Sequence, residues 1–365
     1  MKIKLLLFAF LVVGLSSCIK DEPPYREADI VDMIVEDDAF LTRGITENSV
    51  QMVITRQADY TKIVPIITLS PGATVTPASG VVQDFSKGKI VKYRVTAEDG
   101  VHFKDYLVSV VEKISLKHGF EEWTTGKTPS DKEYPILVDK LWANANSGIA
   151  SFPKYTTVFP TGPTNDCVSG QYAAKLETME GPGKILNFNI PIASGSLFRG
   201  SFSLSITNPR KSLRLGTPHP EEYGIPSVFK GFFKYTPGTV FTDPDGNEVP
   251  GKIDSFSMYA AIFKVTKGAA ADKENLDGES INTSDKVIGR AEWIANDSSI
   301  TTIEAVNGFT EFSIPFVYTE DINFSENDYR LTIVCASSSE GDFYMGSIGS
   351  TLIVDDLEIL CDPVK

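Results

Sequence analysis

Short apolar runs separated by polar turns make up most of the chain, and they predict β-strands. In the first third the runs are 30–35, 50–56, 63–69, 90–97 and 106–112. Within 91–97, apolar residues stand at every odd position and polar residues at 92, 94 and 96. This period of two predicts a strand with one buried and one solvated face. Five short strands with turns between them predict an immunoglobulin-like β-sandwich over residues 29–113.

The same strand-like pattern resumes beyond a junction at residues 113–118. The runs are 185–192, 198–206, 229–236, 256–265, 287–294, 309–318, 329–337 and 351–360. No amphipathic helix pattern lies between them, so a doubly wound α/β domain is excluded. The pattern predicts a two-sheet sandwich or jelly roll over residues 114–365, and therefore an all-β protein with two domains.

The first 17 residues have the pattern of a secretory signal peptide. Lys2 and Lys4 precede an apolar run at residues 5–15, and small residues follow before Cys18. Eleven apolar residues are too few to cross a bilayer as a helix, which needs roughly 20. We therefore expect cleavage of residues 1–17 rather than a transmembrane anchor.

Cys18 is the predicted lipidation site. Leu15-Ser16-Ser17-Cys18 resembles the bacterial lipobox, which implies acylation of Cys18 and anchoring to a membrane; an ordinary signal peptide with a chance cysteine is the alternative. Residues 18–28 predict a tether. Within it, Lys20-Asp21-Glu22 resembles the surface-export signal of Bacteroidetes lipoproteins, which implies the outer membrane and the cell surface, although a merely solvated tether also explains the triplet.

Charge and cysteine content limit the function classes. The chain of 365 residues has a formal net charge of −14 without a basic cluster in the mature part, which argues against nucleic-acid binding. Besides Cys18 there are three cysteines at spacings that match no zinc or iron–sulfur motif. Cys335 and Cys361 are the preferred partners if a disulfide forms, and free buried thiols are the alternative.

Common hydrolytic motifs are absent. There is no G-x-S-x-G sequence, and the three histidines, His102, His118 and His219, do not form an HExxH motif. A glycosidase needs only two carboxylates at a suitable distance, and the sequence cannot select a pair among 48 acidic residues.

Two distant segments resemble the calcium-stabilised jelly rolls of carbohydrate-binding modules. They are Gly119-Phe120-Glu121 at the start of the second domain and Asp355-Asp356 in the last strand. The resemblance implies a structural calcium ion with Glu121, one of Asp355 or Asp356, and the Gly119 carbonyl as ligands, because oxygen atoms suit this ion. The alternative is that these acids are solvated or paired with lysines.

Residues 114–363 resemble a Bacteroidetes family called the "putative carbohydrate metabolism domain". The residues that carry the resemblance are 120–123, Leu141-Trp142 with Asn144 and Asn146, Gly170, 173–178, 197–200, 224–226, 231–238, 346–352 and Asp355-Asp356. The resemblance implies a galactose-binding-like jelly roll behind an Ig-like domain on a lipoprotein, and a role in glycan handling.

Two sets of residues are predicted to contact a sugar. Trp142 stands among Asn144 and Asn146 in an expected loop, where a ring and amides could converge. The second set is Tyr235 with Lys234 and Arg214. For each, the alternative is an ordinary core or surface role.

The resulting hypothesis is a surface lipoprotein whose jelly roll binds carbohydrate, in glycan capture together with other uptake proteins. A glycoside hydrolase of the same fold is one alternative, and a structural or adhesive subunit is another.

Overall fold

The computed structural model describes residues 24–37, 39–55, 58–155, 157–185, 188–205 and 207–364. The predicted signal peptide and the lipidation site Cys18 lie outside these residues. The chain forms two compact units that meet between Val111 and Glu112. In the described part of the chain, no helix has the length and apolar character needed to span a membrane.

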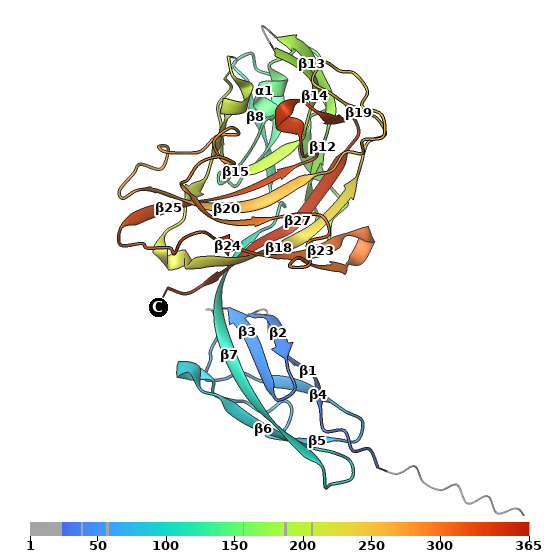
Figure 1. Cartoon of the computed structure of the whole chain (residues 1–365), viewed down its shortest axis with the longest axis vertical. Coiled ribbons are helices and arrows are strands. Elements are labelled where there is room, and N and C mark those ends of the chain that lie inside the picture. Colours follow the sequence, from blue (N-terminus) through green and yellow to red (C-terminus); the bar gives the residue numbers. More distant parts are fainter. Residues whose placement is uncertain are drawn as a thin grey trace, which may run out of the picture. The chain divides into compact units, whose positions relative to one another are not determined.

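The first unit is a small β-sandwich (Figure 1). Its strands are β1 (Ile30–Val35), β2 (Phe40–Ile45), β3 (Ser49–Thr55), β4 (Pro65–Leu69), β5 (Thr74–Thr76), β6 (Val91–Thr96) and the first part of β7 (Phe103–His118), with the 3-10 helix η1 (Ser86–Gly88). Strands β1 and β4 form one sheet, and β2, β3, β7, β6 and β5 form the other in that order.

The alternation predicted for residues 91–97 is confirmed. Tyr93 and Val95 are fully buried, whereas Lys92 and Arg94 are exposed. Met33 from the opposite sheet joins the same apolar core. Because one face of β6 is apolar and the other charged, the strand can pack in one orientation only.

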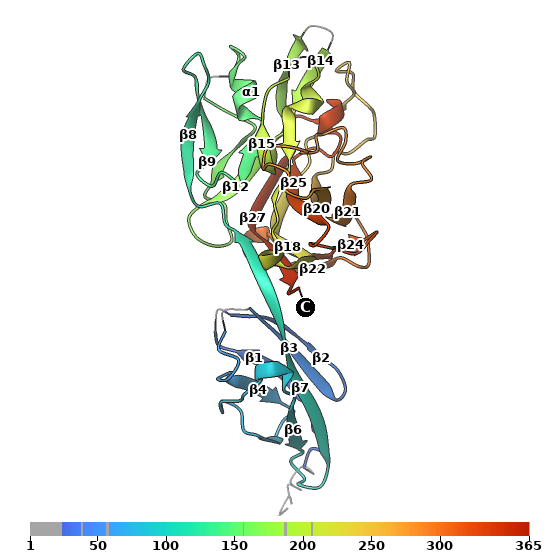
Figure 2. The same cartoon turned by 90° about the vertical axis from the view of Figure 1, so that its left-hand side faces the viewer.

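The second unit contains two large antiparallel sheets (Figures 1 and 2). One follows the order β10 (Trp142–Asn144), β15 (Ser196–Phe202), β25 (Asn327–Ala336), β20 (Ser257–Thr266), β21 (Val287–Glu292) and β24 (Val317–Tyr318), with β16 (Leu213–Leu215) beside β15 and β17 (Thr217–Pro218) beside β25. The other contains β11 (Thr161–Thr164), β12 (Ala173–Glu177), β27 (Thr351–Asp362), β18 (Ile225–Thr236), β23 (Thr310–Pro315) and β22 (Thr301–Glu304), and residues 114–118 of β7 pair with β27.

Shorter elements connect these sheets. Three two-stranded pairs are β8 (Trp123–Lys127) with β9 (Glu133–Leu137), β13 (Met179–Ile185) with β14 (Phe188–Ala193), and β19 (Phe241–Thr242) with β26 (Gly346–Ser347). The helical turns are α1 (Asn146–Ala150), η2 (Pro209–Ser212), η3 (Glu221–Tyr223), η4 (Val306–Gly308) and η5 (Gly341–Phe343). The all-β prediction is therefore confirmed, with an Ig-like sandwich followed by a jelly-roll sandwich.

Strand β20 explains how the second unit is packed. Met258, Ala260 and Ile262 face the core between the two sheets. Tyr259 and Phe263 belong to a separate cluster on the other side of the strand, together with Leu276 and Ile281 from the segment after β20. The strand is thus buried on both faces, which its nearly unbroken apolar sequence allows.

The two cysteines considered for a disulfide are free thiols. Cys335 lies in β25 and Cys361 in β27, and both are fully buried in the core between the sheets. Burial raises the pKa of the Cys361 thiol to about 12. Of the two alternatives stated above, the structure therefore shows the buried-thiol one.

Candidate functional site

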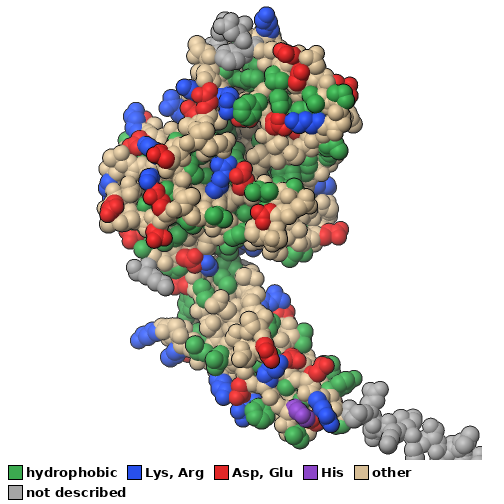
Figure 3. Space-filling view, viewed as in Figure 1, with side chains coloured by type: hydrophobic (Ala, Val, Ile, Leu, Met, Phe, Trp, Pro, Cys, Tyr) green, Lys and Arg blue, Asp and Glu red, His purple; other side chains and the backbone are tan. Residues whose placement is uncertain are grey.

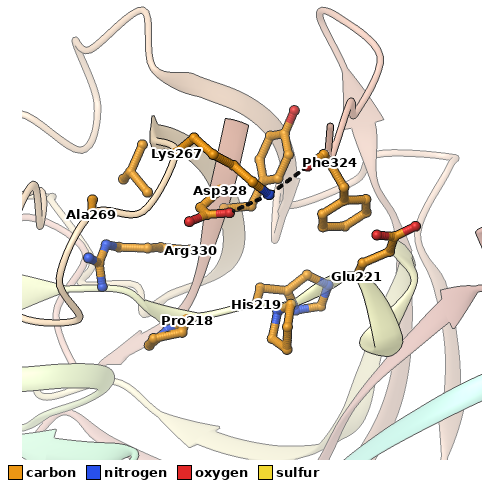
Figure 4. Close-up of a pocket in the computed structure, with 11 residues that line it drawn as sticks. Pro218, His219, Glu221, Lys267, Ala269, Phe324, Asp328 and Arg330 are labelled. Atoms are coloured by element: carbon orange, nitrogen blue, oxygen red, sulfur yellow. Dashed lines mark hydrogen bonds and ion pairs between the residues drawn. The ribbon is translucent and has the colours of Figure 1, made fainter. Parts of the chain in front are cut away.

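A cavity of about 260 Å³ lies in the second unit where β17 and β20 end and β25 begins (Figure 4). Its lining comes from residues 218–221, Val265, Lys267, Ala269, Phe324 and 328–330. Figure 4 shows Phe324, His219 and Glu221 toward one side and Arg330 with Ala269 toward the other. An apolar lining with a few polar groups is typical of small-molecule sites.

The local sequence Pro218-His219-Pro220 holds the histidine at the cavity. Pro218 is the last residue of the edge strand β17, and Pro220 precedes the 3-10 turn η3. The His219 backbone N–H donates to the Tyr329 carbonyl at 2.9 Å, so that His219 stays registered against β25. Proline is tolerated at such positions because no ladder hydrogen bond is needed from it.

The His219 imidazole is neutral and keeps one unpaired acceptor. Its Nε2 lies 2.8 Å from the Gly224 carbonyl, which requires Nε2 to carry the proton. Nδ1 is then an acceptor, and it has no partner among the described residues. Burial lowers the pKa of His219 to about 4; the Gly224 hydrogen bond opposes this shift and the Arg199 charge adds to it.

The two cations of the cavity are already bonded. Lys267 Nζ pairs with Asp328 at 2.9 Å and donates to the Phe324 carbonyl at 2.8 Å. The terminal nitrogens of Arg330 donate to the carbonyls of Ala270 and Ala271. Two hydrogen bonds lower the pKa of Asp328: the one from Lys267 has the larger effect, and the one from the Gly268 N–H the smaller. The carboxylate of Glu221, in contrast, has no side-chain partner in the described part of the chain.

The first predicted sugar-binding set does not lie in an open loop, so the expected loop is wrong, while sugar contact by these residues stays an untested prediction. Trp142 and Asn144 belong to strand β10, and Asn146 begins helix α1. Trp142 and Asn144 are each only 6% exposed, and Asn146 is 1% exposed. Trp142 packs edge-on against Phe120 and His118 with ring centroids 5.3 Å apart. The ring therefore offers no free face to a sugar in this conformation.

The two asparagines have structural partners instead. Asn146 Nδ2 donates to the carbonyls of Pro135 and Thr161, at 2.9 and 2.7 Å. Asn144 Oδ1 accepts the Asn146 N–H at 3.1 Å. These hydrogen bonds connect β9 to β11. They also give the buried amides the hydrogen-bond partners that buried polar groups need.

The second predicted set is not brought together. Arg214 is exposed on β16, which pairs with β15 in the first large sheet, whereas Lys234 and Tyr235 lie on β18 in the other sheet. Lys234 bonds Asp166 at 2.8 Å, and Tyr235 packs partly buried against the core. Successive strand residues face opposite sides, so Lys234 and Tyr235 do not form one surface.

The four predicted metal residues do lie in one neighbourhood. A Cβ added to Gly119 would stand 3.8 Å from Asp356 Oδ1. Glu121, Asp355 and Asp356 all bind the segment 168–172, which we call the clamped segment. Glu121 Oε2 accepts the N–H groups of Gln171 and Tyr172 at 2.7 and 3.1 Å.

The two aspartates bind the start of the clamped segment. Asp355 Oδ2 accepts the N–H groups of Val168 and Ser169 at 2.7 and 3.3 Å, and Asp356 Oδ2 accepts the Ser169 hydroxyl at 2.7 Å. Asp355 is fully buried, and this burial raises the pKa of its carboxyl group against the effect of the Val168 N–H.

These hydrogen bonds engage one carboxylate oxygen each of Glu121 and Asp356 and, with the Asp356 N–H, both oxygens of Asp355. Across the described residues, no group of three or more His, Cys, Asp or Glu side chains is arranged to hold a metal ion. The donor set therefore fits a carboxylate clamp on backbone amides better than a calcium cage, and calcium stays an untested prediction.

Sequence reasoning missed the cavity residues. Lys267, Asp328 and Arg330 come from strand ends that look like ordinary charged turns, and only the fold brings them beside His219. The one available signal was Pro218-His219-Pro220, a histidine fixed between two prolines.

On the face drawn in Figure 3, acidic and basic side chains are interspersed on the second unit. Ion pairs of the second unit include Lys264 with Glu320 at 2.5 Å and Lys252 with Glu340 at 2.6 Å. No broad positive surface appears on that face, which agrees with the sequence argument against nucleic acid.

The fold and the cavity define a two-domain β-sandwich protein with a jelly-roll second domain. The chain belongs to the family described as "Putative carbohydrate metabolism domain", whose model matches residues 119–360. A second model, described as "SGBP, N-terminal", matches residues 35–110. The family resemblance predicted from the sequence is confirmed, and the second unit is a carbohydrate-related domain.

Two solved structures are similar to the chain. One, from Bacteroides thetaiotaomicron and described as "a putative glycoside hydrolase", is 30% identical; the match covers 93% of this chain and 98% of that one, with a TM-score of 0.54. The other, from Bacteroides vulgatus with the same description, is 25% identical; the match covers 67% of this chain and 98% of that one, with a TM-score of 0.55. No curated protein matches the chain significantly.

Proposed function

We propose that this protein is a lipid-anchored surface protein whose second unit binds carbohydrate in the cavity at His219. The observation that carries the proposal is the cavity itself, lined by His219 and by the carboxylate-bearing Glu221, in a domain of a carbohydrate-related family.

The chemistry of the cavity suits a sugar. Sugar hydroxyls are donors that can satisfy carboxylate and imidazole acceptors, and the C–H faces of a sugar ring can pack on apolar side chains such as Phe324 and Pro218. Lys267 Nζ and the terminal nitrogens of Arg330 are bonded to protein oxygens, and of these two side chains only Arg330 Nε keeps an N–H without a partner among the described residues, so a phosphate or uronate would have to compete with these bonds. A neutral sugar is the ligand class that this lining favours.

The sequence supports lipid anchoring and exposure at the cell surface. The lipobox-like Leu15-Ser16-Ser17-Cys18 and the acidic tether behind it favour an anchored, surface-exposed protein. The match of residues 35–110 to the "SGBP, N-terminal" model agrees with a role beside other glycan-uptake proteins. Replacing Cys18 with Ala should release the protein from membranes in cell fractionation, and retention in the membrane fraction would contradict lipid anchoring.

Binding can be tested on a glycan array with residues 19–365. We expect binding to neutral glycans by the wild-type chain and a loss of about tenfold in affinity for His219→Ala, because one buried hydrogen bond of about 1.4 kcal/mol corresponds to that factor. Glu221→Gln should weaken binding less, since the amide keeps one acceptor oxygen. Arg214→Ala is the matched surface control.

The array result separates this proposal from a structural or adhesive role. Absence of binding across host and plant glycans would exclude capture and favour the structural role. A flat surface without a pocket would favour the structural role, and the described residues instead form a cavity.

A glycoside hydrolase is the second candidate, and one carboxyl group favours it. Burial raises the pKa of Asp342, although Arg210 at 3.2 Å opposes the shift. A carboxyl group with a raised pKa can serve as a general acid.

Release of reducing ends from a bound glycan would support the hydrolase. Asp342→Asn should then abolish product formation and leave binding at the cavity unchanged. Binding without product formation supports capture alone.

A further inference from the structure

The second unit has a second hollow. Its lining residues come from other segments of the chain than those of the cavity at His219. It has a volume of about 440 Å³ and is lined by Glu121, Glu122, Trp123, Val138, Pro163 and Tyr172. None of these residues lines the cavity described above. We propose that this hollow, which we call the Trp123 hollow, is a second carbohydrate-binding site that takes a neutral sugar.

The two aromatic side chains of the hollow are held in place. Trp123 is half-buried, and its Nε1 donates to the Phe120 carbonyl at 2.7 Å. This bond satisfies the one polar atom of the indole, and the ring is shared between the core, against which it packs, and the hollow, to which it offers an apolar surface. Tyr172 is also half-buried and lies where the clamped segment enters β12.

The carboxylate clamp fixes the position of Tyr172. Glu121 Oε2 accepts its backbone N–H at 3.1 Å together with that of Gln171. Gly170 has φ +66°, and a Cβ there would stand 1.9 Å from Glu121 Oε1, so only glycine allows this close approach. A site whose walls are fixed before binding loses less entropy when the ligand arrives.

The charge of the lining selects the ligand class. Glu121 and Glu122 contribute carboxylates, and no lysine, arginine or histidine lines the hollow. The Glu122 side chain makes no hydrogen bond or ion pair with any described residue. Carboxylates accept hydroxyl donors and repel phosphate, sulfate and uronate. A neutral sugar therefore fits, with its C–H face on the aromatic rings and its hydroxyls toward Glu122.

An amine would also satisfy carboxylates beside aromatic rings, through a cation–π contact. We argue for the sugar because the hollow lies within residues 119–360, which match a carbohydrate-related family. The test therefore includes a cationic peptide as a competing probe.

The experiment is calorimetric titration of residues 19–365 with neutral hexasaccharides, namely mannohexaose, cellohexaose, xylohexaose and maltohexaose. Tyr172→Ala should weaken binding at this site about tenfold, which corresponds to about 1.4 kcal/mol, and Glu122→Gln should weaken it less. Tyr25→Ala, an exposed tyrosine of the first unit, and Glu304→Gln, an exposed glutamate, are the controls. Circular dichroism would verify that each variant is folded.

Combination with His219→Ala separates this inference from the proposed function. If Tyr172→Ala weakens one binding event and His219→Ala weakens another, both sites bind sugar. If only Tyr172→Ala has an effect, the Trp123 hollow binds sugar and the cavity does not. An effect of His219→Ala alone, no binding of any hexasaccharide, or tighter binding of hexalysine than of the sugars would each overturn the inference.

Discussion

Trp142 and Trp123 are each the first residue of a strand, yet their surroundings in the fold differ. Trp142 is 6% exposed and packs between His118 and Phe120, and its Nε1 has no hydrogen-bond partner in the described residues. Trp123 is half-buried, its Nε1 is bonded to Phe120, and it lines a hollow. Exposure of an aromatic ring thus depends on which elements pack over it, and neighbouring asparagines do not reveal that.

The polar groups around the two tryptophan rings also differ in their exposure. Around Trp142 the polar groups are buried, and they are His118 with the neighbouring Arg199 guanidinium and the backbone-binding amides of Asn144 and Asn146. Around Trp123 the carboxylates of Glu121 and Glu122 face an open hollow. The first region stabilises the fold, and the second has the composition of a binding surface.

The largest expected effect is the removal of the buried ring. Trp142→Ala should lower the free energy of unfolding by about 3–5 kcal/mol, because it removes a large core side chain. Trp123→Ala should cost less, since the ring is already partly exposed. Urea denaturation followed by circular dichroism measures both, and equal losses would contradict the distinction between the two regions.

A pH effect should come next, from the two buried histidines, His118 and His219. Burial, with the Arg199 charge, lowers the pKa of His118 to about 3, and burial lowers the pKa of His219 to about 4. Because these folded-state pKa values lie below the ordinary value of about 6.5, the unfolded chain binds more protons below pH 6.5. Stability from each histidine is fully present above pH 6.5 and should fall by about 2 kcal/mol by pH 5.

The pH prediction can be isolated by the slope of stability against pH. The double variant His118→Gln and His219→Gln should have a shallower slope between pH 7 and 5 than the wild type, whatever its absolute stability. His102→Gln, at an exposed site in the first unit, is the control. An unchanged slope in the double variant would show that the two imidazoles are already protonated or solvent-accessible.

The clamp beside Trp123 should give a smaller effect. Asp355→Ala leaves the N–H groups of Val168 and Ser169 without their acceptor, which should cost about 1–3 kcal/mol. Glu122→Ala, which removes no hydrogen bond, should change thermal stability little. A melting temperature that falls equally in both variants would argue against the clamp.

The smallest effect is expected from a chelator. The hydrogen bonds to the clamped segment account for the positions of Glu121, Asp355 and Asp356 without a metal, so EDTA should leave the melting temperature unchanged. A lower melting temperature that calcium restores would instead establish the predicted calcium site.

The sequence predicted the strands well because their alternation reports burial directly, as in Tyr93 and Val95. It also placed Gly119, Glu121, Asp355 and Asp356 in one neighbourhood, through their resemblance to known jelly rolls. It failed for Trp142, since burial there comes from Phe120 and His118 on another segment. It could not find the cavity, because His219 and Asp328 meet only after β17 pairs with β25.

The central claim is that the second unit binds carbohydrate at His219. The most direct measurement is glycan-array binding of residues 19–365 beside the His219→Ala and Arg214→Ala variants. The account predicts binding to neutral glycans that His219→Ala weakens about tenfold and Arg214→Ala leaves intact. Equal binding by the wild type and by folded His219→Ala, or no binding by the wild type, would contradict it.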